Sequence, residues 1–110
     1  MPEFIQVTTT LDSREAAEAI AQTLVEQRLA ACVHIVGPIV SRYWWQGKID
    51  SSEEWMCVAK TTQERYPDLE RTILGLHSYE VPEVLATPVV AGNERYLEWL
   101  ASEVEGPPTK

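Results

Sequence analysis

Two cysteines and two histidines are the softest candidate metal ligands in this chain: Cys32, Cys57, His34 and His77. A zinc or copper site needs several such ligands at one point, and none of these spacings is that of a metal motif. Cys32 and His34 are two positions apart, so in a strand they would face the same side and could hold a soft cation with one further ligand. Packing is the favoured alternative for both cysteines, because cysteine is among the most buried residue types.

His77 follows a segment that has helical periodicity, so we expect it at the C-terminal end of a helix. An imidazolium there interacts favourably with the helix dipole, which makes capping as good an interpretation as metal ligation. No nucleophilic Cys–His arrangement stands out along the chain. The residues therefore give no signal of catalysis, and we expect a protein that is not an enzyme.

Charged residues offer two further kinds of site. The pairs Glu53-Glu54 and Glu80 with Glu83 could serve acid–base chemistry or bind a hard cation, but a solvated hairpin rim and an ordinary loop are favoured. Lys60 alternates with apolar residues along a predicted strand. A lysine in that position needs an opening to solvent or an anionic partner, either a carboxylate or a bound ligand.

Aromatic residues gather around one predicted hairpin. Tyr43, Trp44, Trp45 and Trp55 lie in or beside it, and Trp99 comes later. Aromatics on a sheet can stack on RNA bases, but such surfaces are basic and this chain has a formal net charge of -8. Neighbouring strand residues point to opposite faces, so at most one of Trp44 and Trp45 easily fills the chain's own core. A protein interface is the better interpretation.

Composition limits the chain to one domain. It has 110 residues, of which 45% are hydrophobic, enough for one core and too few for two. The acidic balance argues against nucleic acid and against anionic membranes. No stretch approaches a spanning helix of about 18 apolar residues, and the first residues do not resemble a signal peptide. We therefore expect a cytoplasmic protein with reduced thiols.

Hydrophobic periodicity predicts alternating strands and helices that position these residues. The first half contains a strand at 3–10 and a helix from an Asp12 N-cap to about Arg28. A strand at 29–36 follows, whose nearly continuous apolar run is typical of a central strand covered on both faces. This strand continues at 39–45 after an interruption at Gly37-Pro38. The second half contains a return strand through 55–61, a helix from near Pro67 to about Leu76, a strand at 84–90 and a last helix capped by Asn93.

This order predicts an α+β fold, the ferredoxin-like split βαβ sandwich of the βαββαβ type with an added C-terminal helix. Both main helices should cover one face of an antiparallel sheet. The domain spans 1–104, and 105–110 is expected to be a flexible tail. The hairpin between the second and third strands is long for so small a domain. It exposes more apolar surface than one core can cover, which predicts an oligomer.

Five blocks in this order resemble the CutA divalent-cation-tolerance family: residues 30–35 (AACVHI), 43–49 (YWWQGKI), 60–62 (KTT), 77–83 (HSYEVPE) and 93–100 (NERYLEWL). The resemblance runs from about residue 7 to residue 100. It implies a ferredoxin-like subunit in a tight homotrimer, similar in design to PII-type signalling proteins. The long hairpin would then extend or cover a neighbour's sheet.

In that family copper binding is attributed to a cysteine in the first strand and to two consecutive histidines. Here Thr8 stands in place of the cysteine and Leu76 in place of the first histidine, so only His77 carries over. The resemblance also implies a cleft between subunits for a small polar or anionic ligand. Its lining would include Cys32, Lys60, Tyr79, Glu83 and Trp99.

Together these observations predict a cytoplasmic homotrimer in divalent metal ion tolerance or homeostasis, with a binding or sensing role. Copper or another divalent cation is the expected ligand, with His77 and Cys32 as candidate metal ligands, and no cofactor is needed for folding. The alternatives are a PII-like sensor of a small ligand held by Lys60, Tyr79 and Glu83 with Trp99, or a structural trimeric scaffold. Neither nucleic acid nor membrane is an expected partner.

Overall fold

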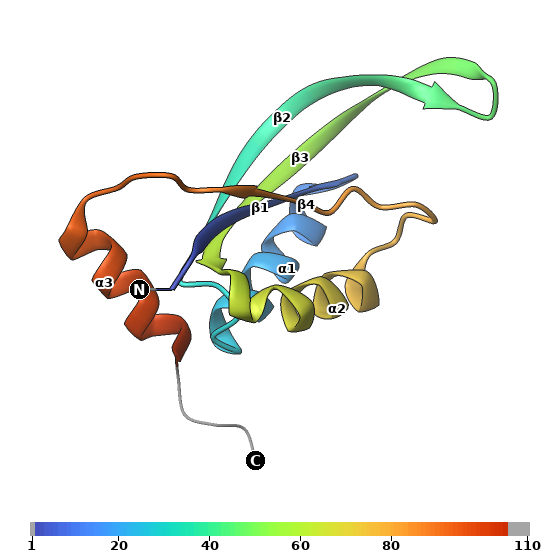
Figure 1. The fold of residues 1–110 in the computed structure, drawn as a ribbon. Coiled ribbons are helices and arrows are strands. Elements are labelled where there is room, and N and C mark those ends of the chain that lie inside the picture. Colours follow the sequence, from blue (N-terminus) through green and yellow to red (C-terminus); the bar gives the residue numbers. More distant parts are fainter. Residues whose placement is uncertain (1, 106–110) are drawn as a thin grey trace.

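A computed structural model describes residues 2–105. Its elements are β1 (Phe4–Leu11), α1 (Arg14–Glu26), β2 (Cys32–Trp45), β3 (Lys48–Thr62), the 3-10 turn η1 (Gln63–Arg65), α2 (Tyr66–Leu76), β4 (Leu85–Pro88) and α3 (Glu94–Glu105). The strands form one antiparallel sheet in the order β2-β3-β1-β4, and α1 and α2 cover one of its faces (Figure 1). The predicted α+β ferredoxin-like order is confirmed.

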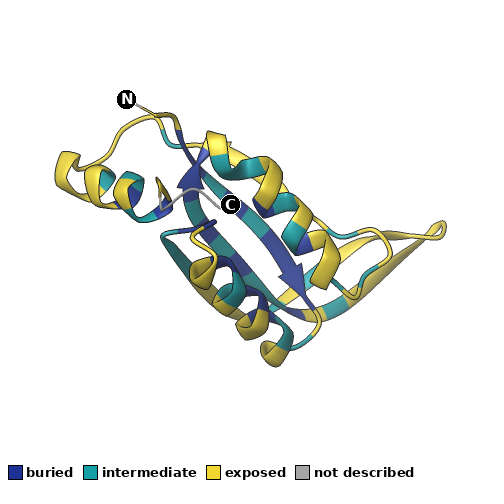
Figure 2. Cartoon of the chain, turned by 90° about the horizontal axis from the view of Figure 1, so that it is seen from below, coloured by how far each residue is buried: buried dark blue, intermediate teal, exposed yellow. Residues whose placement is uncertain are grey.

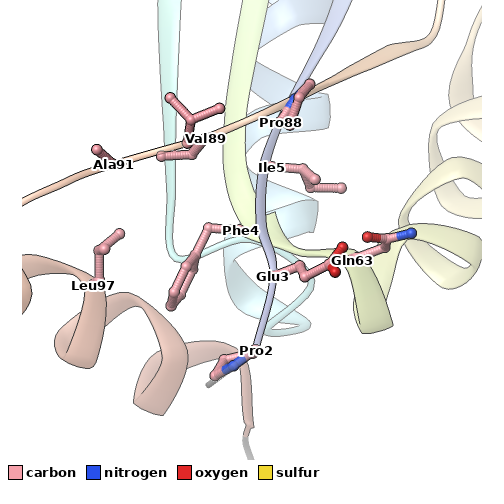
Figure 3. A pocket seen from close by; sticks show the side chains of 10 residues that line it. Pro2, Glu3, Phe4, Ile5, Gln63, Pro88, Val89, Ala91 and Leu97 are labelled. Carbon is pink, nitrogen blue, oxygen red and sulfur yellow. The ribbon is translucent and has the colours of Figure 1, made fainter.

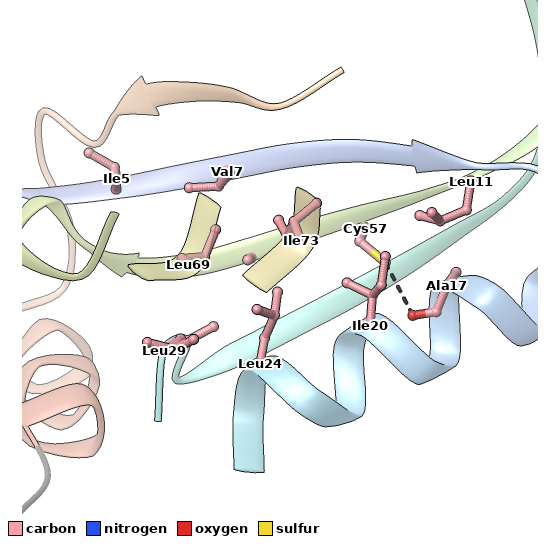
Figure 4. Close-up of a cluster of buried hydrophobic side chains, with 12 residues drawn as sticks. Ile5, Val7, Leu11, Ala17, Ile20, Leu24, Leu29, Cys57, Leu69 and Ile73 are labelled. Atoms are coloured by element: carbon pink, nitrogen blue, oxygen red, sulfur yellow. Dashed lines mark hydrogen bonds between the residues drawn. The ribbon is translucent and has the colours of Figure 1, made fainter. Parts of the chain in front are cut away.

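The core lies between the two helices and the sheet. Buried residues follow the sides of α1 and α2 that face the strands, and the far part of the hairpin is exposed (Figure 2). The fully enclosed side chains of the core include Val7, Leu11, Ile20, Leu24, Cys57, Leu69 and Ile73 (Figure 4). Truncating a large aliphatic side chain at such a site typically costs about 2–5 kcal/mol.

The first helix begins one residue later than predicted. Ser13 has extended backbone angles and its hydroxyl accepts a hydrogen bond from the backbone N–H of Ala16 at 3.0 Å, so Ser13 is the N-cap and Asp12 precedes it. Aspartate and serine both favour the N-cap, and hydrophobic periodicity does not show which of the two neighbours, Asp12 or Ser13, occupies it. The helix ends at Glu26, and Arg28 turns the chain with a φ of 57°.

The hairpin of β2 and β3 leaves the body of the domain as a curved arm (Figure 1). The strands are paired to their tip, with a register shift between Val36 and Ile39 that confirms the predicted interruption at Gly37-Pro38. A Cβ atom at Gly37 would overlap the Trp55 indole, 2.8 Å from its Cγ, so the close crossing needs glycine.

β2 is an edge strand, so the expectation of a central strand covered on both faces is wrong. Its apolar residues Ile35 and Val36 are 36% and 42% exposed, and Val40, farther along the arm, is 71% exposed. A continuous apolar run indicates that both faces of a strand are covered, but it does not identify the segment or chain that covers them. Within one chain, no element covers both faces of β2.

β4 occupies the other edge and is shorter than predicted, ending at Pro88, after which the Val89 N–H donates to the Phe4 carbonyl. The edge position suits Pro88, which has no backbone N–H to donate to a neighbouring strand. No helix within residues 2–105 is long and apolar enough to cross a membrane.

α3 is held by two arginines at its C-terminal end. Arg65 donates from Nε to the Val104 carbonyl and from Nη2 to the Glu105 carbonyl, both at 2.6 Å. Arg28 donates to the carbonyl and carboxylate of Glu103 at 2.9 and 3.0 Å. These guanidinium groups satisfy carbonyls that have no partner inside the helix. Glu105 is thus helical, and the rest of the predicted tail, 106–110, lies outside the described residues.

Candidate functional site

A hollow lined by several predicted site residues lies under the arm, and we call it the arm cleft. Its volume is about 700 Å³. One wall is the distal part of β2 and β3, and the other is the loop that joins α2 to β4. The residues that line it are Thr10, Ser41, Arg42, Tyr43, Trp44, Trp45, Asp50, Glu54, Tyr79, Glu80, Val81 and Glu83.

A buried carboxylate and a tyrosine join the two walls. Glu54 is only 6% exposed, and its Oε2 accepts a hydrogen bond from the Tyr79 hydroxyl at 2.7 Å. Burial first, and then the hydrogen bond to the Glu54 carboxylate and its charge, raise the pKa of Tyr79 well above its ordinary value. The expectation that Glu53 and Glu54 both lie on a solvated hairpin rim is therefore wrong for Glu54, whereas Glu53 is exposed. Sequence reasoning missed this because the bend of the arm brings the loop over Glu54.

His77 sits beside this pair with both ring nitrogens in use. The Tyr79 backbone N–H donates to Nδ1 at 3.2 Å, so Nδ1 presents its lone pair. Nε2 lies 2.9 Å from the Thr10 carbonyl and must carry the proton there. The geometry therefore selects the neutral imidazole protonated on Nε2. A metal ion at His77 would have to displace one of these hydrogen bonds.

Cys32 lies elsewhere, half-buried at the start of β2. Its cross-strand partner on β3 is Lys60, which in turn pairs with Gln6 of β1, so the three share the sheet face turned away from α1 and α2. His34 is on the same face, as expected from its spacing, and is exposed. The Cys32 thiol thus has a lysine as its nearest charged strand neighbour.

Cys57 has a packing role, as favoured from the sequence. It is 1% exposed, and its Sγ donates to the Ala17 carbonyl at 3.4 Å (Figure 4). Burial raises the pKa of the Cys57 thiol to about 11.

Lys60 contacts an aromatic ring, whereas an opening to solvent or an anionic partner was expected. Its Nζ lies 5.9 Å from the centre of the Tyr96 ring of α3, a cation–π contact. The Tyr96 and Trp99 rings are 5.5 Å apart. Helical spacing of Tyr96 and Trp99 was visible in the sequence, but their position over Lys60 depends on how α3 docks.

The four predicted ligand-binding residues therefore fall into two groups within one chain. Lys60 lies near the α3 end of the sheet, and Trp99 is on α3. Tyr79 and Glu83 line the arm cleft, where Tyr79 contacts Glu54, six positions before Lys60 on β3. Within residues 2–105, no three His, Cys, Asp or Glu side chains are grouped so that they could hold a metal ion.

A second, smaller hollow of about 320 Å³ lies where β1, the segment after β4 and α3 meet. Phe4, Val89 and Leu97 contribute apolar walls (Figure 3). None of the predicted site residues lines it.

Comparison with known proteins gives a consistent match. The family model described as "CutA1 divalent ion tolerance protein" matches residues 5–103. The divalent-cation tolerance protein CutA of Thermus thermophilus is 46% identical over 94 residues, which cover 86% of this chain and 91% of the relative. The chloroplastic protein CutA of Arabidopsis thaliana is 43% identical over 87% of this chain, which spans about half (53%) of that relative.

Solved structures agree with these sequence matches. The structure of the periplasmic divalent cation tolerance protein CutA from Archaeoglobus fulgidus superposes with a TM-score of 0.89 at 37% identity. The match covers 92% of this chain and 98% of that one.

Proposed function

Because the chain belongs to the CutA1 divalent ion tolerance family, we propose that it acts in the tolerance of cells to divalent cations as a binding or sensing protein. The family match over residues 5–103 carries this proposal. A non-catalytic role is consistent with relatives that are named as tolerance proteins.

The working unit in this proposal is a homotrimer. The open β2 edge and the arm support it, because unpaired strand edges and exposed aromatic surface favour association with another chain. Trp44 is 72% exposed and Ile49 is 66% exposed. A closed cyclic assembly would cover both without leaving an edge free to recruit further copies.

The proposed ion is copper or another divalent cation, and the trimer is what would complete its site. His77 and Cys32 are the candidate ligands, yet they lie in different parts of one subunit, and residues 2–105 contain no ready cluster. A site between subunits would meet the need for several converging ligands. Binding at His77 would release the Tyr79 N–H or the Thr10 carbonyl from the imidazole.

The test is calorimetric titration of copper into the reduced protein, with zinc for comparison and the assembly mass measured by light scattering in the same buffer. Submicromolar binding of about one ion per subunit to a trimer is expected. Replacing His77 or Cys32 by alanine should abolish it. Glu64→Gln is the control, because Glu64 is an exposed residue of η1, away from both His77 and Cys32 in the sequence and outside the proposed set. Weak binding without preference for copper would contradict the metal proposal.

The proposed compartment is the cytoplasm, where the two free cysteines would stay reduced. Two similar proteins are named as chloroplastic and periplasmic, so similarity to them does not itself fix the compartment. Cell fractionation with an antibody to the chain tests this part of the proposal.

A PII-like sensor of a small polar or anionic ligand is the second candidate, favoured by one observation. Lys60 is a half-buried residue whose ammonium lies 5.9 Å from the centre of the Tyr96 ring, and among the described residues no carboxylate lies within ion-pair distance of it, which suits an incoming anion. In a trimer the Lys60 and Trp99 end of one subunit would have to meet Tyr79 and Glu83 of another. A thermal-shift screen of metabolites and nucleotides tests it, and a trimer that responds to none would favour a structural scaffold.

A further inference from the structure

Two hydrogen bonds inside one subunit link His77 to the root of the arm. The His77 Nδ1 accepts from the Tyr79 backbone N–H at 3.2 Å, and the Tyr79 hydroxyl donates to Glu54 Oε2 at 2.7 Å. Glu54 belongs to β3 and is 6% exposed within its own subunit. We call these three residues the relay. Because all three belong to one subunit, their contacts do not depend on which surfaces an assembly covers.

The His77 end of the relay is held on its other sides. The His77 backbone N–H donates to the Ile73 carbonyl at the end of α2 at 2.9 Å. Its Nε2 lies 2.9 Å from the carbonyl of Thr10, a buried residue of β1. The imidazole is therefore anchored to a helix and to a central strand, and Tyr79 is the member of the relay that can move.

Tyr79 ties the segment 78–84 to the body of the domain. Within residues 2–105, its N–H and its hydroxyl make the only two hydrogen bonds of that segment. The Tyr79 and His77 rings also lie against each other, with centroids 4.8 Å apart. The far end of the segment is anchored where Val84 packs on the core. A ligand that displaces the Tyr79 N–H therefore also shifts the ring and the hydroxyl of the same residue.

Glu54 lies where the arm bends. It pairs with Ile39, the first paired residue of β2 after the register shift that follows Val36. From Glu54 towards the tip, β3 extends back to Lys48, a span of roughly 20 Å at about 3.3 Å per residue. A small rotation at Glu54 is therefore enlarged along the arm.

The His77 ring has the arrangement that metal-binding histidines use. In such histidines the second ring nitrogen commonly donates to a backbone carbonyl, which fixes the ring and leaves the other lone pair for the ion. Nε2 has that role with Thr10, so Nδ1 is the nitrogen for an incoming cation, and its bond to the Tyr79 N–H is the longer of the two. No group of three potential ligands converges within residues 2–105, so further ligands would have to come from another subunit.

We propose that Tyr79 transmits binding at His77 to the arm: a ligand that takes the Nδ1 lone pair displaces the Tyr79 N–H, the hydroxyl leaves Glu54, and the arm is released at its root. The released arm changes its contacts with neighbouring subunits, which gives a binding protein a conformational output. That a divalent cation is this ligand rests on the proposed function, whereas the relay itself is a property of the folded subunit.

Two substitutions at His77 test the relay without metal. The asparagine amide places its oxygen where Nδ1 stands, and the glutamine amide reaches the place of Nε2. Hydrogen exchange, followed by mass spectrometry on the full-length protein in its native assembly, compares peptides covering 78–84 and 48–54. His77→Gln should speed exchange about fivefold in both, because one hydrogen bond of the relay is lost. His77→Asn should leave the 48–54 peptide within about twofold of the unmodified protein.

Tyr79→Phe separates transmission from local loosening. It removes the hydroxyl that reaches Glu54 and keeps the backbone N–H on the His77 ring. Adding His77→Gln to Tyr79→Phe should speed exchange in the 78–84 peptide but not further in the 48–54 peptide. A 48–54 peptide unchanged in His77→Gln overturns the relay, and so do equal effects of His77→Gln and His77→Asn.

Copper, added at about one equivalent per subunit to the reduced protein, tests the ligand-driven step. It should speed exchange of both peptides in the unmodified protein, and by reciprocity it should bind Tyr79→Phe severalfold more tightly, because the contact that opposes binding is gone. Copper that binds but leaves the 48–54 peptide unchanged overturns the proposal, even where a His77 variant fails to fold. Copper that does not bind counts against the proposed function, and the His77→Gln comparison then decides the relay by itself.

Discussion

Replacing Tyr79 by phenylalanine tests the contact that joins the arm to the body of the domain. The substitution keeps the ring and removes the hydroxyl that donates to Glu54 Oε2 at 2.7 Å. Hydrogen bonds to a charged acceptor contribute about 1.5–3 kcal/mol. Oε2 faces the arm cleft once the hydroxyl is gone, and water can enter there, so we expect a loss near the lower end, about 1.5 kcal/mol in the free energy of unfolding.

The assay is urea unfolding at a fixed protomer concentration, because any oligomer makes apparent stability depend on concentration. A double-mutant cycle with Glu54→Gln isolates the contact, and a coupling of about 1 kcal/mol or more is expected. Tyr96→Phe is the control, since Tyr96 is 40% exposed and its hydroxyl has no described hydrogen bond. It should stay within about 0.5 kcal/mol of the unmodified protein.

The same tyrosine predicts a pH dependence. The pKa of Tyr79 is raised in the folded state, chiefly by burial and then by Glu54, so the folded protein holds the proton that the unfolded chain releases above about pH 10. The free energy of unfolding should therefore fall above that pH by about 1.4 kcal/mol per pH unit. Tyr79→Phe should remove this contribution to the pH dependence. Zero coupling to Glu54, together with an unchanged slope in Tyr79→Phe, would refute the reasoning.

Three further predictions concern other parts of the fold. Because burial raises the pKa of Cys57 from 9.0 to about 11, the free energy of unfolding should fall by about 3 kcal/mol between pH 9 and pH 11. Cys57→Ala should remove this fall, as measured by urea unfolding at alkaline pH. Gly37→Ala should cost about 1–3 kcal/mol, seen as a lower melting temperature, because its Cβ overlaps the Trp55 indole; a neutral effect would mean that the arm yields freely there. Arg65→Ala should speed amide hydrogen exchange across α3 while α1 stays protected, since Arg65 holds two carbonyls at the end of α3; uniform exchange would contradict this role.

The order of elements followed from local physics and could be predicted. Alternation of apolar residues, the Asn93 cap and the proline positions depend on near neighbours, so they specify strands, helices and breaks before any tertiary contact forms. The bulge at Gly37-Pro38 was predictable for the same reason. Neighbouring candidates for one role, such as Asp12 and Ser13 at the start of α1, are not separated by such signals.

The candidate site depended on contacts between distant segments. Glu54 and Tyr79 are 25 positions apart, and nothing local to Glu54 distinguishes it from the exposed Glu53. Lys60 meets Tyr96 because α3 docks beside β3, with Leu100 and Val104 buried and two arginines bonded to its C-terminal end. Likewise, the apolar run of β2 predicted a covered strand, whereas spatial strand order placed it at an edge.

The sequence by itself therefore determined the element order, the acidic balance, the aromatic arm and the family blocks, because each is a property of residue types and short spacings. Only the tertiary structure decided that Glu54 is buried, that the His77 imidazole has both nitrogens engaged and that the predicted ligand residues separate into two groups. Burial and hydrogen bonding depend on which surfaces the folded chain brings together, and that information is carried by long-range packing rather than by neighbouring residues.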